Sequence, residues 1–308
     1  MRAVITRRAL LVALAVALPA CGRSSPPIVV ASGEQGGLYA EFAELLVRRL
    51  GTEGLAAHAV ETGGSVDNIE AVAGGSATLG LTLTDIALTA LRGEPPFAAP
   101  VPLHALGRVY ENYMQFVVRA EDPARSAADL AGRPVSLGAV GSGAAVFGDR
   151  LLAAAGVAAD VARRPLRDAI DALERGSTDA LLWSGGIPTP ALAELAARRP
   201  VRLLPLAEHL PALLARHGSA YGPATVPAGA YGSVAPVPTV GVANLLVAMP
   251  TLAADVADVV VGALVAGAPE LVPAAALGTQ YLDQRSLIGT GDVPLHPAAA
   301  ATYRRLHG

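Results

Sequence analysis

The stretch IVVASGEQGGLYAEFAELLVRRLG, residues 28–51, decides the fold. Its first four residues are apolar and favour a buried strand, and its last fourteen carry leucines at helical spacings of three and four. These helical positions are Leu38, Phe42, Leu45, Leu46 and Leu50. Gly33, Gly36 and Gly37 stand between the two patterns. A strand, a glycine-rich turn and a helix form the opening unit of an α/β protein, and the turn serves as a plain connection, a phosphate cradle or a seat for another anion.

The same alternation continues along the chain. LAAHAVET, SVDNIEAVAGG, ATLGLTLT and DIALTALRG predict strand, helix, strand and helix, with Ser65 as the N-cap of the first of these helices. Farther on, DAIDALERGSTDALLWSGG parallels DNIEAVAGGSATLGLTLTD. We therefore expect two α/β lobes of related topology, each with a parallel sheet.

Two extended segments are expected to cross between the lobes. LHALGRVYENYMQFVVRAED contains two extended runs around residues 110–113, and VPTVGVANLLVAM is a long extended run downstream. Two crossings create a cleft with a hinge at its base. The Pro/Gly-rich YGPATVPAGAYGSVAPVP before the second crossing is expected to be an ordered surface loop, packed through Tyr221 and Tyr231.

The N-terminus has the features of a secretion signal. MRAVITRR is basic, ALLVALAVAL is an apolar run too short to span a bilayer, and LPAC follows it. The segment resembles a bacterial lipoprotein signal, which implies lipidation of Cys21; a secreted protein without the lipid is the alternative. Cys21 is the only cysteine, so no internal disulfide can form.

Composition excludes several functions. The chain has 308 residues, a formal charge of -3 and no lysine, which excludes Schiff-base chemistry and a P-loop lysine. It has no basic surplus for nucleic acid. Its six histidines show no i, i+4 metal spacing, and no nucleotide fingerprint or nucleophile elbow is present. We expect no cofactor and no metal.

Four glycine-rich loops follow predicted strands: SGEQGGLY (32–39), TGGS (62–65), GSG (141–143) and WSGG (183–186). Ligands of open parallel sheets bind at the carboxyl ends of the strands, and helix N-termini there offer N–H donors to a small anion. Each loop alone is explained as an ordinary turn, but their recurrence in both halves favours a ligand site.

Individual residues near these loops have two interpretations. Trp183 either ends a core strand or lines the cleft, and Asp85 either caps a helix or contacts ligand. Tyr110 in the first crossing either packs or closes over a ligand. Arg108 and Arg119 flank this crossing and are the candidates for a carboxylate clamp.

Six segments occur in an order that resembles one known family. They are GGLYAEFAELL, VETGGSVDNIEAVAGGSATLGLTLTDIA, YMQFVVRAE…SAADLAGRPVSLGAVGSG, LLWSGGIPTPALAELA, VPAGAY…VPTVGVANLLVAM and VPLHPAAAATYRR. Together they resemble the TAXI family, the extracytoplasmic solute receptors of TRAP transporters. The resemblance implies an α/β, two-lobed periplasmic-binding-protein (Venus-flytrap) fold with two crossing strands. It also implies capture of a small carboxylate or amino acid, such as glutamate or 2-oxoglutarate, for a TRAP permease.

The site and the domains expected from these arguments can be stated by residue. The ligand-binding residues are Ser32, Gly33, Gly36, Gly37, Tyr39, Gly64, Ser65, Thr84, Asp85, Tyr110, Ser142, Gly143, Ala144, Trp183, Ser184, Gly185 and Gly186, with the hydroxyls of Ser32, Ser65, Thr84, Ser142 and Ser184 as donors. The domains are 1–20 signal peptide, 21–27 tether, 28–112 plus 246–308 first lobe, and 113–245 second lobe. Ala144 departs from the family, where threonine is common at this position. Glu34 either faces solvent or binds an amino group of the ligand.

We expect a monomeric, periplasmic lipoprotein that is not an enzyme. Its partners would be an anionic or zwitterionic small molecule, TRAP permease subunits and a lipid anchor. The sequence leaves two alternatives open: a binding protein that reports to a membrane signalling partner, and an enzyme on the same scaffold.

Overall fold

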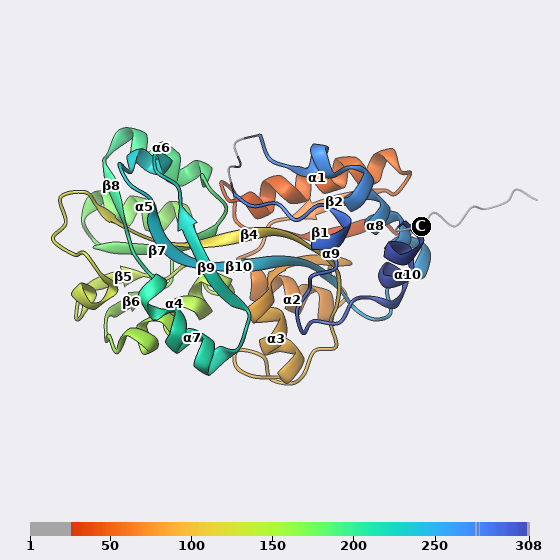
Figure 1. Ribbon diagram of the computed structural model, residues 1–308, viewed down its shortest axis with the longest axis horizontal. Helices are drawn as coiled ribbons and strands as arrows, with labels where there is room; N and C mark the ends of the chain where they lie inside the picture. Colours follow the sequence, from red (N-terminus) through yellow and green to blue (C-terminus); the bar gives the residue numbers. More distant parts are fainter. Residues whose placement is uncertain (1–25, 275, 277, 307–308) are drawn as a thin grey trace, which may run out of the picture.

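The computed structural model describes residues 26–274, 276 and 278–306, and two lobes are built around a shared sheet (Figure 1). The signal segment and Cys21 lie outside the described residues. The first lobe contains β1 (Ile28–Ala31), α1 (Leu38–Thr52), β2 (Ala57–Val60), α2 (Ser65–Ala73), β3 (Leu79–Leu83), α3 (Thr84–Arg92), α8 (Ala254–Ala266), η4 (Ala268–Leu271), α9 (Gln284–Leu287) and α10 (Pro297–Leu306).

The second lobe contains η1 (Ala127–Leu130), β5 (Pro134–Ser136), α4 (Gly143–Ala155), β6 (Asp160–Ala162), α5 (Leu166–Arg175), β7 (Ala180–Gly185), α6 (Pro190–Arg198), β8 (Val201–Leu204), η2 (Ala207–His209), α7 (Leu210–His217), β9 (Tyr221–Val226) and η3 (Ala230–Gly232). Two long strands, β4 (His104–Arg119) and β10 (Val237–Ala248), run through both lobes. In Figure 1 they cross the centre of the molecule side by side, as their antiparallel pairing requires.

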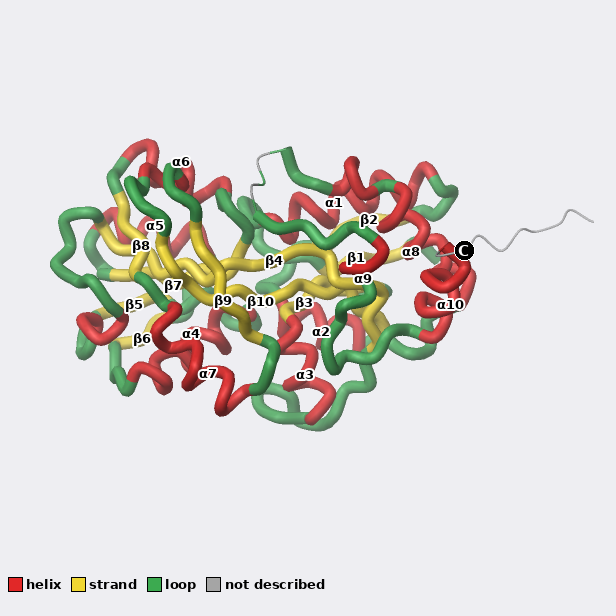
Figure 2. The backbone as a smooth tube through the Cα atoms, in the orientation of Figure 1, coloured by secondary structure: helices red, strands yellow, loops and turns green. Residues whose placement is uncertain are grey.

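The strand order is β2-β1-β3-β10-β4-β7-β5-β6, with β8 paired to β4 and β9 paired to β10. β1, β2 and β3 are parallel, as are β5, β6 and β7, whereas β10 runs antiparallel to β3 and β4. Figure 2 shows helices on both faces of this sheet. Every residue of β3 (LGLTL) is buried, as expected for a parallel strand covered on both sides.

Separate apolar clusters stabilise each lobe. Phe42 and Leu46 of α1 belong to one cluster with residues of α8 and α10 in the first lobe, and Leu181 of β7 belongs to another with residues of α5 and α6 in the second. A third cluster contains residues of both lobes, among them Ile86 of α3 and Phe147 of α4, and therefore joins the lobes. The described chain contains no helix long and apolar enough to cross a membrane.

Three local expectations from the sequence differ from the structure. The first crossing is one continuous strand, β4, because β10 pairs with its residues 104–113, with local irregularities, and β7 and β8 pair with its residues 113–119. Residues 221–226, expected in a loop, form β9 because they complete the ladder beside β10, although Tyr221 and Tyr231 are buried as expected. Ser65 is the first residue of α2 and Gly64 is its cap, because the Ser65 hydroxyl instead accepts a hydrogen bond from the Leu83 N–H.

Candidate functional site

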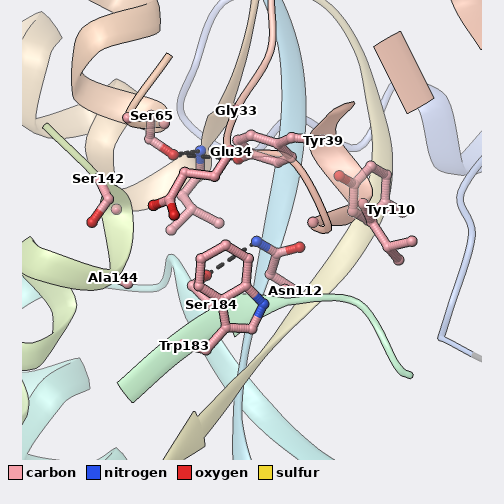
Figure 3. A pocket seen from close by; sticks show the side chains of 17 residues that line it. Gly33, Glu34, Tyr39, Ser65, Tyr110, Asn112, Ser142, Ala144, Trp183 and Ser184 are labelled. Carbon is pink, nitrogen blue, oxygen red and sulfur yellow. Dashed lines mark hydrogen bonds between the residues drawn. The ribbon is translucent and has the colours of Figure 1, made fainter. Parts of the chain in front are cut away.

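A pocket with an empty volume of ≈ 430 Å³ lies between the two lobes, beside β4 and β10 (Figure 3). The space in it that the centre of a water-sized sphere can reach is only ≈ 40 Å³, so the pocket in this closed arrangement suits a small ligand. The lining residues are Gly33, Glu34, Gly37, Leu38, Tyr39, Gly63, Gly64, Ser65, Leu83, Tyr110, Asn112, Ser142, Gly143, Ala144, Trp183, Ser184 and Gly185. Each of the four glycine-rich loops contributes to this wall. Ser32, Gly36, Thr84, Asp85 and Gly186, which the sequence also suggested, do not line it.

Three helices begin at the pocket: α1 at Leu38, α2 at Ser65 and α4 at Gly143. Helix N-termini leave N–H groups without intrahelical acceptors. The Val66 and Asp67 N–H groups both donate to the Gly141 carbonyl across the cleft, which holds the lobes together in a closed arrangement. Within the described chain, the N–H groups of Ser65, Gly143 and Ala144 have no protein acceptor and remain for a ligand.

The glycines of the first loop serve three different needs. Gly36 has a φ of +84°, which only glycine adopts easily. A Cβ on Gly37 would lie 3.0 Å from the Trp183 ring of the other lobe, and one on Gly33 would lie 2.9 Å from Tyr39 Cβ. The loop is therefore a close-packing turn against the opposite lobe and its own helix.

A directed chain of hydrogen bonds forms one side of the pocket. The Tyr39 hydroxyl donates to Asn244 Oδ1, Asn244 Nδ2 donates to Asn112 Oδ1 at 2.8 Å, and Asn112 Nδ2 donates to Ser184 Oγ at 3.0 Å. Because Ser184 already accepts, its own hydroxyl proton is free to donate. No described residue accepts that proton, so it is available to an acceptor in the pocket.

Three of the other predicted hydroxyls donate to backbone carbonyls of the protein. Ser32 donates to the Val60 carbonyl, Thr84 to the Ala243 carbonyl and Ser142 to the Ala139 carbonyl. Ser142 Oγ also caps α4 by accepting from Ala145 N–H at 3.0 Å. The hydroxyl of Ser65 lies 3.3 Å from Tyr39 Oη, a long contact that a ligand acceptor could replace.

Trp183 forms a wall of the pocket and is 8% exposed. Its indole N–H donates to Thr189 Oγ1 at 3.0 Å, and the Tyr231 hydroxyl accepts from Thr189 N–H and donates to Gln115 Oε1 at 2.7 Å. Buried hydrogen bonds of this kind fix an orientation as well as adding stability. From the sequence, Trp183 could either end a core strand or line the cleft. In the structure it does both.

Glu34 is the only charged residue in the pocket lining. It extends from the first lobe, and its Oε2 accepts from the Leu166 N–H at the start of α5 in the second lobe. Its other oxygen, Oε1, is buried and has no hydrogen-bond partner in the described chain. Burial raises the pKa of Glu34 to about 7, although the Leu166 hydrogen bond opposes this rise.

Asp85 lies away from the pocket in a buried interlobe ion pair. Its Oδ2 accepts from Arg150 Nη1 at 2.8 Å and from the Tyr221 hydroxyl at 2.7 Å. Arg150 also donates to Thr89 Oγ1 of α3. Burial raises the pKa of Asp85, and Arg150 opposes that effect. Asp85 therefore ties α3 to α4 and β9, a role that neither sequence interpretation included.

The predicted arginine clamp is wrong. Arg108 pairs with Glu111 at 3.0 Å and lies 3.6 Å from the centre of the Tyr281 ring. Arg119 pairs with Asp179 and donates to the Leu173 and Thr178 carbonyls. Both guanidinium groups are engaged outside the pocket, although Arg108 Nε has no hydrogen-bond partner in the described chain, so the donors in the pocket wall are backbone N–H groups and hydroxyls.

Sequence reasoning missed Asn112, Asn244 and Leu83. Asn244 interrupts an apolar strand, and a polar residue there signals a buried hydrogen-bonding need. No group of three or more metal-ligating side chains occurs in the described chain.

Solved structures share this architecture. A protein of Bordetella bronchiseptica RB50 matches with a TM-score of 0.54 and 19% identity, covering 91% of this chain and 82% of that one. A periplasmic transporter matches with a TM-score of 0.54 and 14% identity, covering 91% and 92%. The arginine-, lysine-, histidine-binding protein ArtJ of Geobacillus stearothermophilus matches with a TM-score of 0.50 and 10% identity, covering 80% and 92%.

These likenesses show that the fold is the two-lobed fold of periplasmic binding proteins. A family model described as the NMT1-like family matches residues 30–305, nearly the whole described chain. The chain therefore belongs to the NMT1-like family.

Proposed function

We propose that this protein is an extracytoplasmic solute receptor that captures a small carboxylate or amino acid for a TRAP-type secondary transporter. The observation that carries the proposal is the pocket between the lobes. Free N–H groups of Ser65, Gly143 and Ala144 and the Ser184 hydroxyl line it, and no arginine or histidine does. Such a donor set stabilises a small anion.

Ligand binding would be coupled to closure of the cleft. The first lobe supplies the Ser65 N–H, and the second supplies Gly143, Ala144 and Ser184. β4 and β10 are the only described strands that run through both lobes, so they would bend as the cleft opens. The closed form would then dock on the permease, with Cys21 as a lipid anchor.

The test compares two serines that face the same pocket. Ser184→Ala should weaken carboxylate binding about tenfold or more, because a hydrogen bond to a charged group contributes about 1.5–3 kcal/mol. Ser142→Ala should lower stability by about 1 kcal/mol through loss of the α4 cap and should change affinity less. Trp183, the sole tryptophan, reports binding by its fluorescence.

A ligand screen decides the proposal itself. A ligand at a hundred times its Kd should add about 2.7 kcal/mol of stability to the protein. A panel of amino acids, dicarboxylates and sugars in a thermal-unfolding assay should show stabilisation by carboxylates. Stabilisation by neutral sugars alone, or turnover of any carboxylate, contradicts a carboxylate receptor.

A further inference from the structure

Glu34 is placed unusually for a residue in an anion-binding pocket. It brings a carboxylate into a wall that contains no cationic side chain. A ligand carboxylate and the Glu34 carboxylate would repel one another there, and like charges in low dielectric interact strongly. The Glu34 carboxylate therefore needs a counter-charge that the described pocket residues do not supply.

The two oxygens of Glu34 have different surroundings. Oε2 is held by the Leu166 N–H, across the cleft. Oε1 is buried without a donor, and leaving a buried acceptor unsatisfied costs free energy. Figure 3 shows the side chain reaching from the Gly33 loop toward the loop that carries Ser142. One oxygen is thus used to bridge the lobes, and the other is left for a ligand.

We propose that Glu34 determines the specificity of this pocket, and that the ligand carries a protonated amine that donates to Glu34 Oε1. This inference rests on the proposed function and narrows it from carboxylates in general to amino acids. The ligand carboxylate would occupy the donors of Ser65, Gly143, Ala144 and Ser184. The ammonium would neutralise Glu34, and the complete site would then hold a zwitterion without excess charge.

The surroundings of Glu34 predict opposite pH dependences for the two ligand classes. Glu61 and Asp168 raise its pKa further, and Arg167 lines the adjacent open groove with Glu34. Because this pKa is about 7, an amine ligand should bind about tenfold more tightly at pH 8 than at pH 6, as Glu34 becomes ionised. A carboxylate without an amine should show the reverse trend.

The experiment uses probe pairs that differ only in the amine: L-glutamate with glutarate, L-leucine with 4-methylpentanoate, and L-alanine with propionate. Affinities come from calorimetry and Trp183 fluorescence at pH 6, 7 and 8. In the wild type, the amine member of the best-binding pair should bind at least tenfold more tightly at pH 7. In Glu34→Gln this preference should fall below about threefold and the pH trends should disappear, because hydrogen bonds to charged groups account for about tenfold to a hundredfold in affinity.

Glu44→Gln is the matched control, since Glu44 is exposed on α1 and does not line the pocket. It removes the same charge and should keep both the amine preference and the pH trends. If Glu34→Gln keeps the preference, or if the wild type binds both members of each pair equally, the inference is overturned while the proposed function stands. If no carboxylate binds, with or without an amine, the proposed function fails and this inference fails with it.

Discussion

Adding one methyl group at Gly143 should hinder closure of the cleft without preventing the protein from folding. A Cβ at this position would lie 2.5 Å from Leu83 Cδ1 and 3.0 Å from Ser65 Oγ, both on the opposite lobe. Ordinary carbon contacts are about 3.5–4.0 Å, so the lobes would have to move apart by about 1 Å. Overpacking of this kind costs about 1–3 kcal/mol.

This cost should fall on the closed form alone. Gly143 is the first residue of α4 and does not have a positive φ, so alanine adopts the same backbone there without strain. Gly143→Ala should therefore raise the ligand Kd by about fivefold to 150-fold. Its unliganded unfolding midpoint should stay within a few degrees of the wild type.

The assay pairs a Trp183 fluorescence titration with thermal unfolding of the same samples. Gly262→Ala is the matched control, because a Cβ on Gly262, within α8, would meet no atom within 4 Å. It should leave affinity unchanged. An affinity of Gly143→Ala within twofold of the wild type would refute the idea that α4 must approach Leu83 this closely for binding.

Two further substitutions test the buried polar groups. Arg150→Met should destabilise the protein by about 3–5 kcal/mol at pH 7, because it leaves the buried Asp85 carboxylate without its ion-pair partner. Since the folded pKa of Asp85 is raised above its ordinary value, the folded variant takes up a proton on acidification, so urea denaturation should show a smaller penalty at pH 4.5 than at pH 7. Thr189→Val removes the acceptor of the Trp183 indole N–H; it should increase indole mobility in fluorescence anisotropy and weaken ligand binding about fivefold, and unchanged anisotropy would contradict a positioning role.

The architecture could be predicted from the sequence because it follows from periodicity and repetition. The buried run at residues 79–83, the helical face of residues 38–52 and the similar order of elements in the two halves all correspond to observed strands and helices. These signals are local, and burial on both faces of a parallel sheet leaves a clear apolar pattern. The glycine-rich loops met at one pocket for the same reason, since parallel strands place their carboxyl ends at one edge.

The chemistry of the site was less predictable because it depends on bond direction and partner choice. The sequence does not indicate which acceptor a loop serine donates to. Ser142 donates to a carbonyl, whereas the Ser184 hydroxyl has no acceptor in the described chain. Arg108 and Arg119 were plausible clamps by position, yet nearby carboxylates and carbonyls satisfy them. Such hydrogen bonds and ion pairs depend on the tertiary fold, so they cannot be predicted from periodicity and spacing in the sequence.

In the proposed receptor, the distribution of donors between the lobes would make binding and closure a single event. The Ser65 N–H belongs to one lobe, and the N–H groups of Gly143 and Ala144 belong to the other. An anion held by one lobe has only part of this donor set and remains in water, where each hydrogen bond contributes little net free energy. Only closure brings the sets together and excludes water, and closure requires that Gly37 and Gly143 have no side chain where they meet the opposite lobe. The glycines of the strand–turn–helix units thus act less as a flexible cradle than as the surface on which the two lobes fit.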